Sequence, residues 1–280
     1  MAPFIGFFLL LLTSSSSSSL AWGLSACSEE DNTCFRWIPG GDHPCTITRM
    51  TKDEFLHRFG PQGLPLLYPE PLVIVDGDRN IHFRNLTHLD HILHSFPPDF
   101  PVTLSSSNSF SEHRRTIAIR LYIEEVLSGE TLPDRLSNET WYLFGETYTD
   151  DWKQLLKNYE LPPCRACTAE SVALSFGIGN RGSGVQWHIH GPGFSEAVHG
   201  RKHWVLYRNK PRFHPNQTSR NWMENNYLTL SDAELPFECT LNPGDLIYFP
   251  DRWWHATINL DRYTAFVSTF TQEHELFSML

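Results

Sequence analysis

Three histidines in the second half of the chain have the spacing of metal ligands. His188 and His190 flank a single residue, and His255 follows two tryptophans farther along the chain. If the first pair lies on an extended strand, both imidazoles point to the same face and can reach one metal ion. Two close ligands and one distant ligand can assemble a facial set of three, as in non-haem iron sites. The pattern therefore predicts a metal centre at His188, His190 and His255.

Two further motifs accompany these histidines. Gly200 to Trp204 has the sequence GRKHW and leads into an apolar run, and Pro243 to Pro250 has the sequence PGDLIYFP. Together with the HIH and WWH segments, they resemble the signature of the JmjC family of 2-oxoglutarate-dependent iron oxygenases. Phe176-Gly177 and Gly182-Ser183-Gly184 are also similar to the glycine-rich approach strand of that family. The resemblance extends over about residues 50–270.

This resemblance implies a fold, two cofactors and roles for individual residues. The implied fold is a double-stranded β-helix, which is a cupin-like jelly-roll barrel, and the implied cofactors are Fe(II) and 2-oxoglutarate. His188 and His255 match the two histidine ligands of the family. Lys202 matches the lysine that pairs with the distal carboxylate of 2-oxoglutarate. A lysine suits that task because its ammonium group is a compact point charge.

Four positions depart from the family pattern. The position of the acidic metal ligand holds His190. Val185, Gly193 and Ser268 occupy positions where relatives often place polar contacts to the co-substrate. Imidazole can still coordinate a metal ion, but it lacks the negative charge of a carboxylate. These departures put the turnover of 2-oxoglutarate in doubt but not the fold.

Two functions of different classes remain open. We favour a JmjC-fold protein of the secretory pathway that acts as a non-catalytic protein-interaction or regulatory module, because fold alone does not fix function. The alternative is an Fe(II)/2-oxoglutarate-dependent hydroxylase that acts on a lumenal protein. Zinc is a third possibility for the site, since three neutral histidines and a water form a good zinc set. Protein partners are expected, whereas the net charge of −10 disfavours nucleic acid because the chain would repel phosphates.

The elements that position these residues differ between the two halves of the chain. Helical patterns occupy residues 51–59, where Thr51 and Glu54 predict a capping box, and residues 152–159. From about residue 170, short strand-like runs are separated by Gly, Pro and Asn. We therefore expect an α+β chain with a β-barrel core and with helices mostly in the N-terminal half. The strand-like runs are 172–178, 185–189, 203–208, 237–241, 245–249, 254–258 and 263–270.

The N-terminus predicts a secretory signal peptide over residues 1–23. Phe4 to Leu12 is an apolar run whose helix of roughly 13 Å is too short for a hydrocarbon core of roughly 30 Å. Ala21-Trp22-Gly23 provides small residues at a cleavage site. No Lys or Arg precedes the apolar run, so an uncleaved anchor is the alternative. We expect a cysteine-containing segment over 24–50, a JmjC-type domain over 51–280 and no stable membrane span after cleavage.

Sequons and cysteines agree with residence in the endoplasmic reticulum lumen or elsewhere in the secretory pathway. The cysteines are even in number and all follow the predicted cleavage point, which favours disulfides in an oxidising compartment. The CxxC segment at 164–167 could be a structural bridge, a redox motif or half of a zinc site. Pro162-Pro163 before it favours the structural bridge. The sequons begin at Asn85, Asn138 and Asn216, and the disulfide candidates are Cys27, Cys34, Cys45, Cys164, Cys167 and Cys239.

We expect the protein to be lumenal and N-glycosylated, because an apolar N-terminal run precedes three sequons. An endoglycosidase should lower its apparent mass. Replacing one sequon asparagine by glutamine should reduce that mass shift by the contribution of the glycan at that site. Protease should spare the protein in sealed microsomes and digest it after detergent. An unchanged mass together with digestion in intact vesicles would contradict this prediction.

Overall fold

The described part of the chain covers most of the predicted domain. The computed structural model describes residues 43 to 271, apart from residues 44, 66, 112 and 127–140. All of these lie in the larger of two compact units, Phe35–Leu280. The predicted signal peptide, Cys27, Cys34 and the sequon at Asn138 lie outside the described residues. Within the described residues, no helix has the length and the apolar character needed to cross a membrane.

Short strands and short helices alternate in the first half of the described chain. The predicted capping box is confirmed: the amide of Glu54 donates to Thr51 Oγ1 at 3.3 Å, and the amide of Thr51 donates to the Glu54 carboxylate at 2.7 Å. The elements are β1 (Thr48–Thr51), α1 (Lys52–Phe59), β2 (Leu72–Val75), α2 (Ile81–Leu86), a 3-10 helix (Ile92–Ser95), β3 (Pro101–Ser106), β4 (Arg114–Ala118), α3 (Ile119–Leu121), a π-helical turn (Tyr122–Val126), β5 (Trp141–Leu143) and α4 (Asp150–Leu156).

Strands dominate the second half, as the recurring apolar runs predicted. One predicted strand is wrong, because residues 185–189 form a loop that contributes a single β-bridge. The helix α5 and the strand β7 were not predicted. The elements are β6 (Val172–Gly179), β7 (Gly193–His199), β8 (Lys202–Tyr207), α5 (Ser219–Asn225), two 3-10 helices (Tyr227–Thr229 and Asp232–Glu234), β9 (Phe237–Leu241), β10 (Leu246–Phe249), β11 (Trp254–Asn259) and β12 (Thr264–Thr271).

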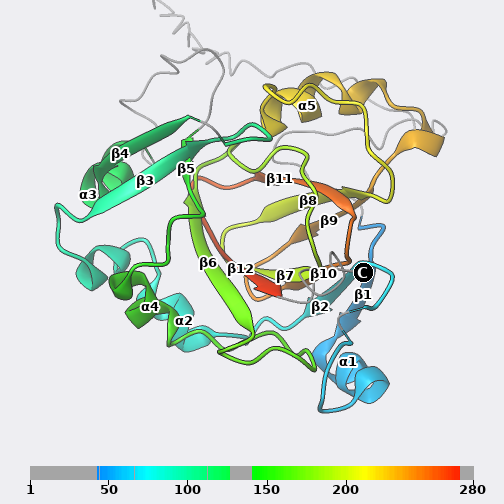
Figure 1. The fold of residues 1–280 in the computed structure, drawn as a ribbon, viewed down its shortest axis with the longest axis horizontal. Helices are drawn as coiled ribbons and strands as arrows, with labels where there is room; N and C mark the ends of the chain where they lie inside the picture. The colour runs from blue at the N-terminus through cyan, green and yellow to red at the C-terminus, as the bar shows by residue number, and fades with distance from the viewer. Residues whose placement is uncertain (1–42, 44, 66, 112, 127–140, 272–280) are drawn as a thin grey trace, which may run out of the picture. The chain divides into compact units, whose positions relative to one another are not determined.

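The described strands form two sheets. The larger has nine strands in the order β1-β2-β10-β7-β12-β6-β5-β3-β4, and the smaller has the order β11-β8-β9. The strands β1 and β2 pair in parallel, and the other pairs are antiparallel. Side chains of β8 and β11 line the same pocket as side chains of β10 and β12, so the two sheets face each other there. Figure 1 shows the small sheet lying across from β7, β10 and β12.

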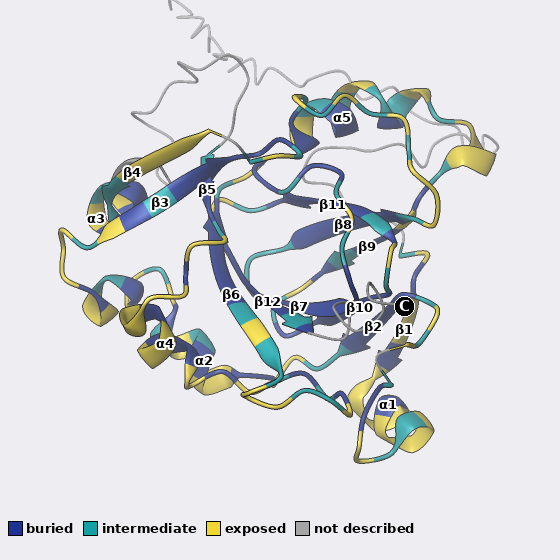
Figure 2. Cartoon of the chain, viewed as in Figure 1, coloured by how far each residue is buried: buried dark blue, intermediate teal, exposed yellow. Residues whose placement is uncertain are grey.

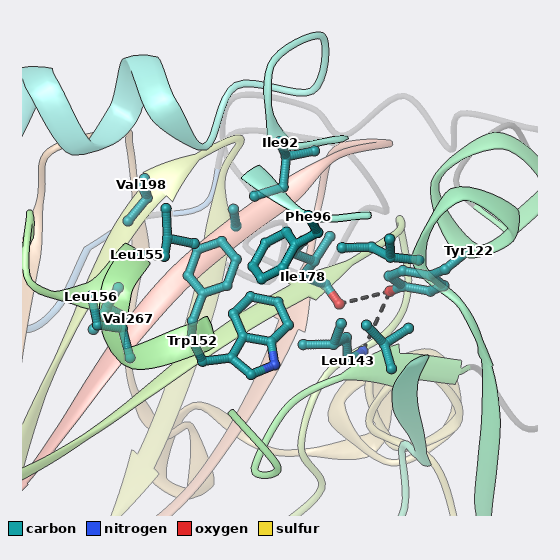
Figure 3. Close-up of a cluster of buried hydrophobic side chains, with 14 of the residues drawn as sticks. Ile92, Phe96, Tyr122, Leu143, Trp152, Leu155, Leu156, Ile178, Val198 and Val267 are labelled. Carbon is teal, nitrogen blue, oxygen red and sulfur yellow. Dashed lines mark hydrogen bonds between the residues drawn. The ribbon is translucent and has the colours of Figure 1, made fainter. Parts of the chain in front are cut away.

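The main hydrophobic cluster lies between the large sheet and the helices of the first half. Figure 2 shows that the central strands are buried while α1 and α4 expose their outer faces. In Figure 3, Trp152 of α4 packs beside Phe96, and the Tyr122 hydroxyl donates to the Ile178 carbonyl at 2.7 Å. Burying each large apolar side chain of this kind stabilises the fold by about 1.5–3 kcal/mol. The cluster therefore anchors the large sheet.

A buried carboxylate explains why β7 escaped prediction. Glu196 has no exposed surface, although its polar side chain interrupts the apolar pattern of the strand. Arg79 Nε and Asn80 Nδ2 each donate to Glu196 Oε2 at 2.8 Å, and the Tyr159 hydroxyl donates to the same oxygen at 2.9 Å. Burial raises the pKa of Glu196, and Arg79 opposes that shift. Buried charges are tolerated when they are paired in this way.

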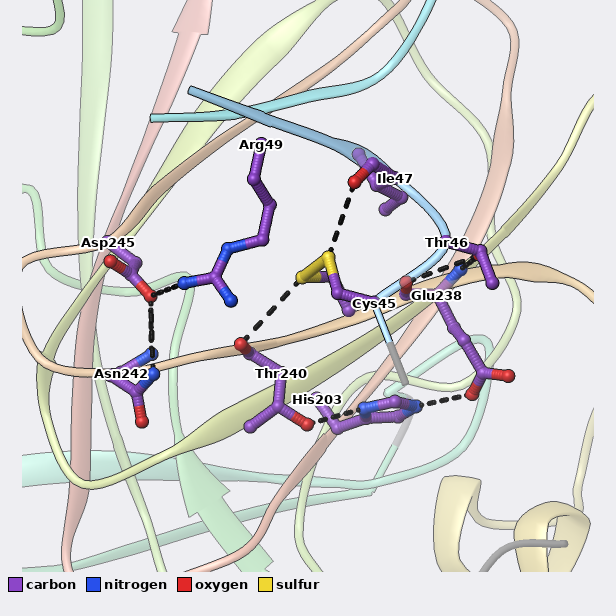
Figure 4. The surroundings of a disulfide bond; sticks show 10 residues. Cys45, Thr46, Ile47, Arg49, His203, Glu238, Thr240, Asn242 and Asp245 are labelled. Carbon is purple, nitrogen blue, oxygen red and sulfur yellow. Dashed lines mark hydrogen bonds and ion pairs between the residues drawn. A yellow bond between two sulfur atoms is a disulfide. The ribbon is translucent and has the colours of Figure 1, made fainter. Parts of the chain in front are cut away.

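The two disulfides of the described residues close loops of very different length. One joins Cys45 to Cys239 across a sequence separation of 194 residues, and the other joins Cys164 to Cys167. Figure 4 shows the first bridge fastening the segment before β1 to β9. The same segment is also held by backbone contacts, because the Thr46 amide donates to the Glu238 carbonyl at 2.8 Å. The long-range bridge therefore ties the start of the domain to the small sheet.

Removing the two bridges should have unequal effects on stability. In the loop-entropy description, closing a loop of 100 residues or more stabilises the native state by about 4–5 kcal/mol, against about 2 kcal/mol for a loop of a few residues. Replacing Cys45 and Cys239 together by serine should thus lower the free energy of unfolding in urea by more than replacing Cys164 and Cys167 together. Equal losses for the two double variants would contradict the assignment of the long-range bridge as the stabilising one.

Candidate metal centre

Backbone pairing brings the three predicted histidine ligands together. His188 and His255 form an isolated antiparallel bridge, in which each amide donates to the carbonyl of the other at 3.0 Å. The amide of Arg252 donates to the His190 carbonyl at 3.1 Å, so residue 190 is fixed beside the same segment. The loop before β7 and the start of β11 therefore run side by side. The side chains follow from this register, with the ring centroids of His188 and His255 4.2 Å apart.

The distances between the imidazole nitrogens fit one metal ion. One ligand nitrogen from each histidine lies within 4.8 Å of the others, and no second group of three potential ligands gathers in this way among the described residues. The Nε2 atoms of His190 and His255 are 3.2 Å apart. Nitrogens bound to one ion at about 2.1 Å lie roughly 3–3.5 Å from each other. The group is therefore already spaced for coordination.

Hydrogen bonds fix the tautomer of all three imidazoles. In each ring Nδ1 lies 2.8 Å from a main-chain carbonyl oxygen, which can only accept. Nδ1 must therefore carry the proton, and Nε2 keeps a free lone pair. Two such lone pairs that face each other repel, and a cation between them removes the repulsion. The accepting carbonyls belong to Gln186 for His188, to Gly191 for His190 and to Trp253 for His255.

Burial keeps His188 and His255 neutral, and a histidine must be neutral to bind a metal. Burial, followed by the nearby His190, lowers the pKa of His188 to about 3. Burial and the two neighbouring histidines hold the pKa of His255 well below its ordinary value. Phe249 and Trp204 stack on the His255 ring with centroids 4.9 and 5.7 Å away, which keeps water from that face. His188 and His255 therefore present uncharged nitrogen ligands at neutral pH.

Comparison with known proteins agrees with this arrangement. Residues 179–277 match the JmjC domain. The chain is 38% identical to JmjC domain-containing protein 8 of Homo sapiens over 245 residues, which are 84% of this chain and 89% of that protein. The chain belongs to the JmjC domain family. A JmjC domain implies a cupin-like jelly-roll fold, and the described residues are mostly β structure with few helices.

Other relatives extend the same comparison. The match to JmjC domain-containing protein 8 of Rattus norvegicus has 39% identity and covers 81% of this chain and 82% of that protein. Lysine-specific demethylase JMJ21 of Arabidopsis thaliana is 29% identical over 55% of this chain and 17% of its own length. JmjC domains generally use Fe(II) and 2-oxoglutarate, and the three-histidine group offers nitrogen ligands that fit such an ion.

The lysine that matches the co-substrate anchor of JmjC domains is buried and already has partners. Lys202 is 1% exposed and points from β8 into the pocket of the histidines. Its Nζ donates to Asn259 Oδ1 at 3.0 Å and lies 3.8 Å from the centroid of the Phe266 ring. Burial lowers the pKa of Lys202 to about 7. The ammonium group is thus satisfied by this chain's own side chains.

The pocket beside the histidines is small and mostly aromatic. Its empty volume is about 310 Å³, part of which is open to solvent, and the centres of water molecules can reach about 30 Å³ of it. Phe266 can lie across it because Gly177 faces the ring, where a Cβ would come within 2.3 Å of the Phe266 Cζ atom. The residues therefore fit a metal ion, whereas the Phe266 ring and Asn259 lie on the lysine that 2-oxoglutarate would have to reach. No lining residue is acidic; the lining is Phe144, Val185, His188, His190, Lys202, Trp204, Phe249, His255, Thr257, Phe266, Ser268 and Phe270.

Only some of the other positions that depart from the family pattern lie in the pocket. Val185 and Ser268 line the pocket, whereas Gly193 packs against the Phe249 ring at the start of β7. The sequon residues Asn85 and Asn216 are exposed. Sequence reasoning missed the aromatic wall, although alternation along β12 places Phe266, Ser268 and Phe270 on one face and could have indicated it.

Metal analysis should find one divalent ion for each wild-type chain. His188→Ala or His255→Ala should weaken binding more than about 100-fold, because each removes a ligand, while His199→Gln outside the group should not. Protons compete with the metal for Nε2, so affinity falls as pH falls. Because burial depresses the pKa of His188 and His255, binding should persist to about pH 5, below the ordinary histidine range. Metal-free protein with an intact fold would contradict the ligand assignment.

Proposed function

We propose that this JmjC domain protein binds a divalent metal ion but does not turn over 2-oxoglutarate, and that it acts as a protein-interaction or regulatory module in the lumen of the secretory pathway. One observation carries this proposal. The ammonium group of Lys202, which matches the co-substrate anchor, is occupied by Asn259 and covered by the Phe266 ring. 2-Oxoglutarate would have to displace both contacts before it could bind.

The cost of that displacement supports the proposal. A desolvated cation–π contact stabilises a protein by about 2 kcal/mol, and a hydrogen bond to a charged group by about 1.5–3 kcal/mol. A carboxylate would replace these contacts with a stronger one, but the Phe266 ring must first leave the pocket. The ring is held between Lys202 and Gly177, with Phe144 5.2 Å away. The pocket is therefore organised around its own lysine and not around a co-substrate.

The charge of the metal centre also differs from that of an iron centre with a carboxylate ligand. An imidazole that coordinates a metal carries no charge, so with His190 in place of an acidic ligand the bound metal would keep one more unit of positive charge. A unit charge at about 4 Å corresponds to about 4 kcal/mol at an effective dielectric of 20, before desolvation offsets it. Iron(II) would supply the redox step of 2-oxoglutarate chemistry when bound. In this chain the residues would hold the ion and exclude water through Trp204 and Phe249.

Features outside the pocket support residence in the lumen and a protein partner. The N-terminal apolar run and the exposed sequon asparagines support the lumen. Two exposed apolar side chains support a protein partner: Ile189, between two of the ligands, is 41% exposed, and Phe237, whose ring contacts that of Trp253, is 40% exposed. Contiguous exposed apolar patches mark interaction sites, and these two side chains are the candidates for such a patch.

The alternative is an Fe(II)/2-oxoglutarate-dependent hydroxylase that acts on a lumenal protein. Its support is that His188, His255 and Lys202 all line one pocket. Metal analysis distinguishes zinc from iron, and a 2-oxoglutarate decarboxylation assay on the same sample distinguishes a module from an enzyme. The protein should come from a eukaryotic secretory host so that its disulfides form.

Variants of the pocket should gain the 2-oxoglutarate binding and decarboxylation that the wild type lacks. Phe266→Ala should open the space above Lys202 and raise 2-oxoglutarate affinity by at least tenfold in calorimetry, whereas Phe270→Ala, on the same strand face, should not. His190→Asp should bind iron(II) at least as well as wild type and show more uncoupled decarboxylation, since it restores the ligand charge.

A control identifies the anchor in these variants. Adding Lys202→Ala to Phe266→Ala should remove the gained 2-oxoglutarate affinity, by one to two powers of ten for a contact of about 1.5–3 kcal/mol, and should leave the metal content unchanged. Brisk substrate-coupled turnover by the wild type that is lost in His190→Asp would show that the three-histidine centre is itself the working catalyst.

A further inference from the structure

The disulfide of the CxxC segment lies on a turn that the main chain holds by itself. The amide of Leu64 donates to the Pro163 carbonyl at 2.9 Å, and the amide of Arg165 donates back to the Leu64 carbonyl at 3.1 Å. Within the turn, the amide of Cys167 donates to the Cys164 carbonyl at 3.2 Å. These bonds do not involve sulfur, so the two thiols would remain close together after the bridge opens. The bridge can therefore open and close without unfolding the segment.

A glycine makes this support possible. At Gly63 a Cβ atom would lie 2.1 Å from the Pro163 carbonyl oxygen, and the residue has a φ of +74°, which favours glycine. The strand-like segment at 63–64 can therefore approach the turn closely enough to hydrogen bond with it. This contact, and not the short covalent loop, fixes the position of the turn. As a structural link, the second bridge adds less to stability than the long-range bridge does.

The two sulfur-bearing residues differ in access to solvent. Cys164 is 9% exposed and packs in an apolar cluster with Phe55 and Leu64. Cys167 is half-buried and lies at the edge of the same cluster. Attack on a disulfide requires a direct approach to one sulfur, and the other sulfur leaves. The geometry makes Cys167 the sulfur that a partner can reach and Cys164 the buried leaving group.

Two aromatic side chains pack against the same cluster as Cys167. Phe59 and Tyr68 also pack at the rim of the cluster, with ring centroids 5.4 Å apart in an edge-to-face arrangement. Leu56 and Leu67, which belong to the same two segments, are 41% and 63% exposed. An extended peptide with apolar side chains on either side of a cysteine would find matching contacts here.

We propose that Cys164 and Cys167 form a redox-active pair that exchanges disulfides with dithiols in apolar segments of other polypeptides. A partner thiolate attacks Cys167 Sγ, the S–S bond breaks, and its electron pair leaves on Cys164 Sγ, which takes up a proton. The second partner thiolate then attacks the partner sulfur of the mixed disulfide. Cys167 leaves as a thiolate and is protonated, so the partner is oxidised by two electrons and the pair is reduced. Glutathione disulfide can reoxidise the pair.

Glutathione buffers provide the first test. Full-length protein from a eukaryotic secretory host is equilibrated over a series of glutathione ratios, quenched with acid, alkylated and analysed by peptide mass spectrometry. The Cys164–Cys167 pair should be half reduced at a value of [GSH]²/[GSSG] at least tenfold lower than the Cys45–Cys239 pair in the same sample. The circular dichroism spectrum should remain native at that point. Opening of both pairs at the same ratio would overturn the proposal.

Single cysteine variants provide the second test. The probes are synthetic peptides with one activated cysteine, flanked either by leucine and phenylalanine or by serine and glycine. Cys164→Ser, which leaves the accessible thiol, should form the mixed disulfide at least tenfold faster than Cys167→Ser, which leaves the buried one. The apolar peptide should react faster than the polar peptide, and Leu67→Ser should reduce that preference. Equal rates for the two cysteine variants, or no preference between the peptides, would show a structural bridge alone. Neither test depends on a metal ion, so failure here leaves the proposed function of the histidine centre untouched.

Discussion

Two backbone hydrogen bonds between residues 188 and 255 hold the metal centre together. They join His188, in the loop before β7 of the large sheet, to His255, the second residue of β11 in the small sheet. Both partners are metal-ligand candidates, so the same contact that links the sheets also sets the separation of two imidazoles. The third ligand, His190, is placed by one further amide from Arg252. Coordination geometry in this domain is therefore a property of the main chain.

Neutral groups dominate the electrostatics of the site. Every imidazole donates from Nδ1 to a carbonyl, and burial keeps His188 and His255 unprotonated. Lys202, the cationic side chain of the pocket lining, finds its partners in an amide oxygen and in the face of an aromatic ring. An iron centre that turns over 2-oxoglutarate draws on a ligand carboxylate and on a lysine free to bind the co-substrate. In this chain His190 is an imidazole, and the Phe266 ring lies over Lys202.

The disulfides show that one covalent bond type can serve two purposes in one domain. Cys45–Cys239 closes a long loop and fastens the segment before β1 to β9, where Cys239 is fully buried beside Trp204 in a shared hydrophobic cluster. Cys164–Cys167 closes a short loop whose shape is already set by hydrogen bonds to residue 64. Loop length and access decide the difference: the first bridge limits the unfolded chain, and the second leaves one sulfur open to attack.

The sequence by itself determined the family, the capping box of α1, most strands after residue 170 and the identity of the three histidines, because local patterns and side-chain type carry that information. It could not show that residues 185–189 form a loop. Their alternating apolar residues look like a strand, but in the structure only His188 pairs with another strand, through one bridge to β11. It could not show that Glu196 sits in a buried strand, since its partners Arg79, Asn80 and Tyr159 come from distant segments. Only the tertiary structure decided the burial, the contacts and the pKa of Lys202. Its charge is set by burial, by Asn259 and by the Phe266 ring, and strand pairing brings these together only when the chain folds.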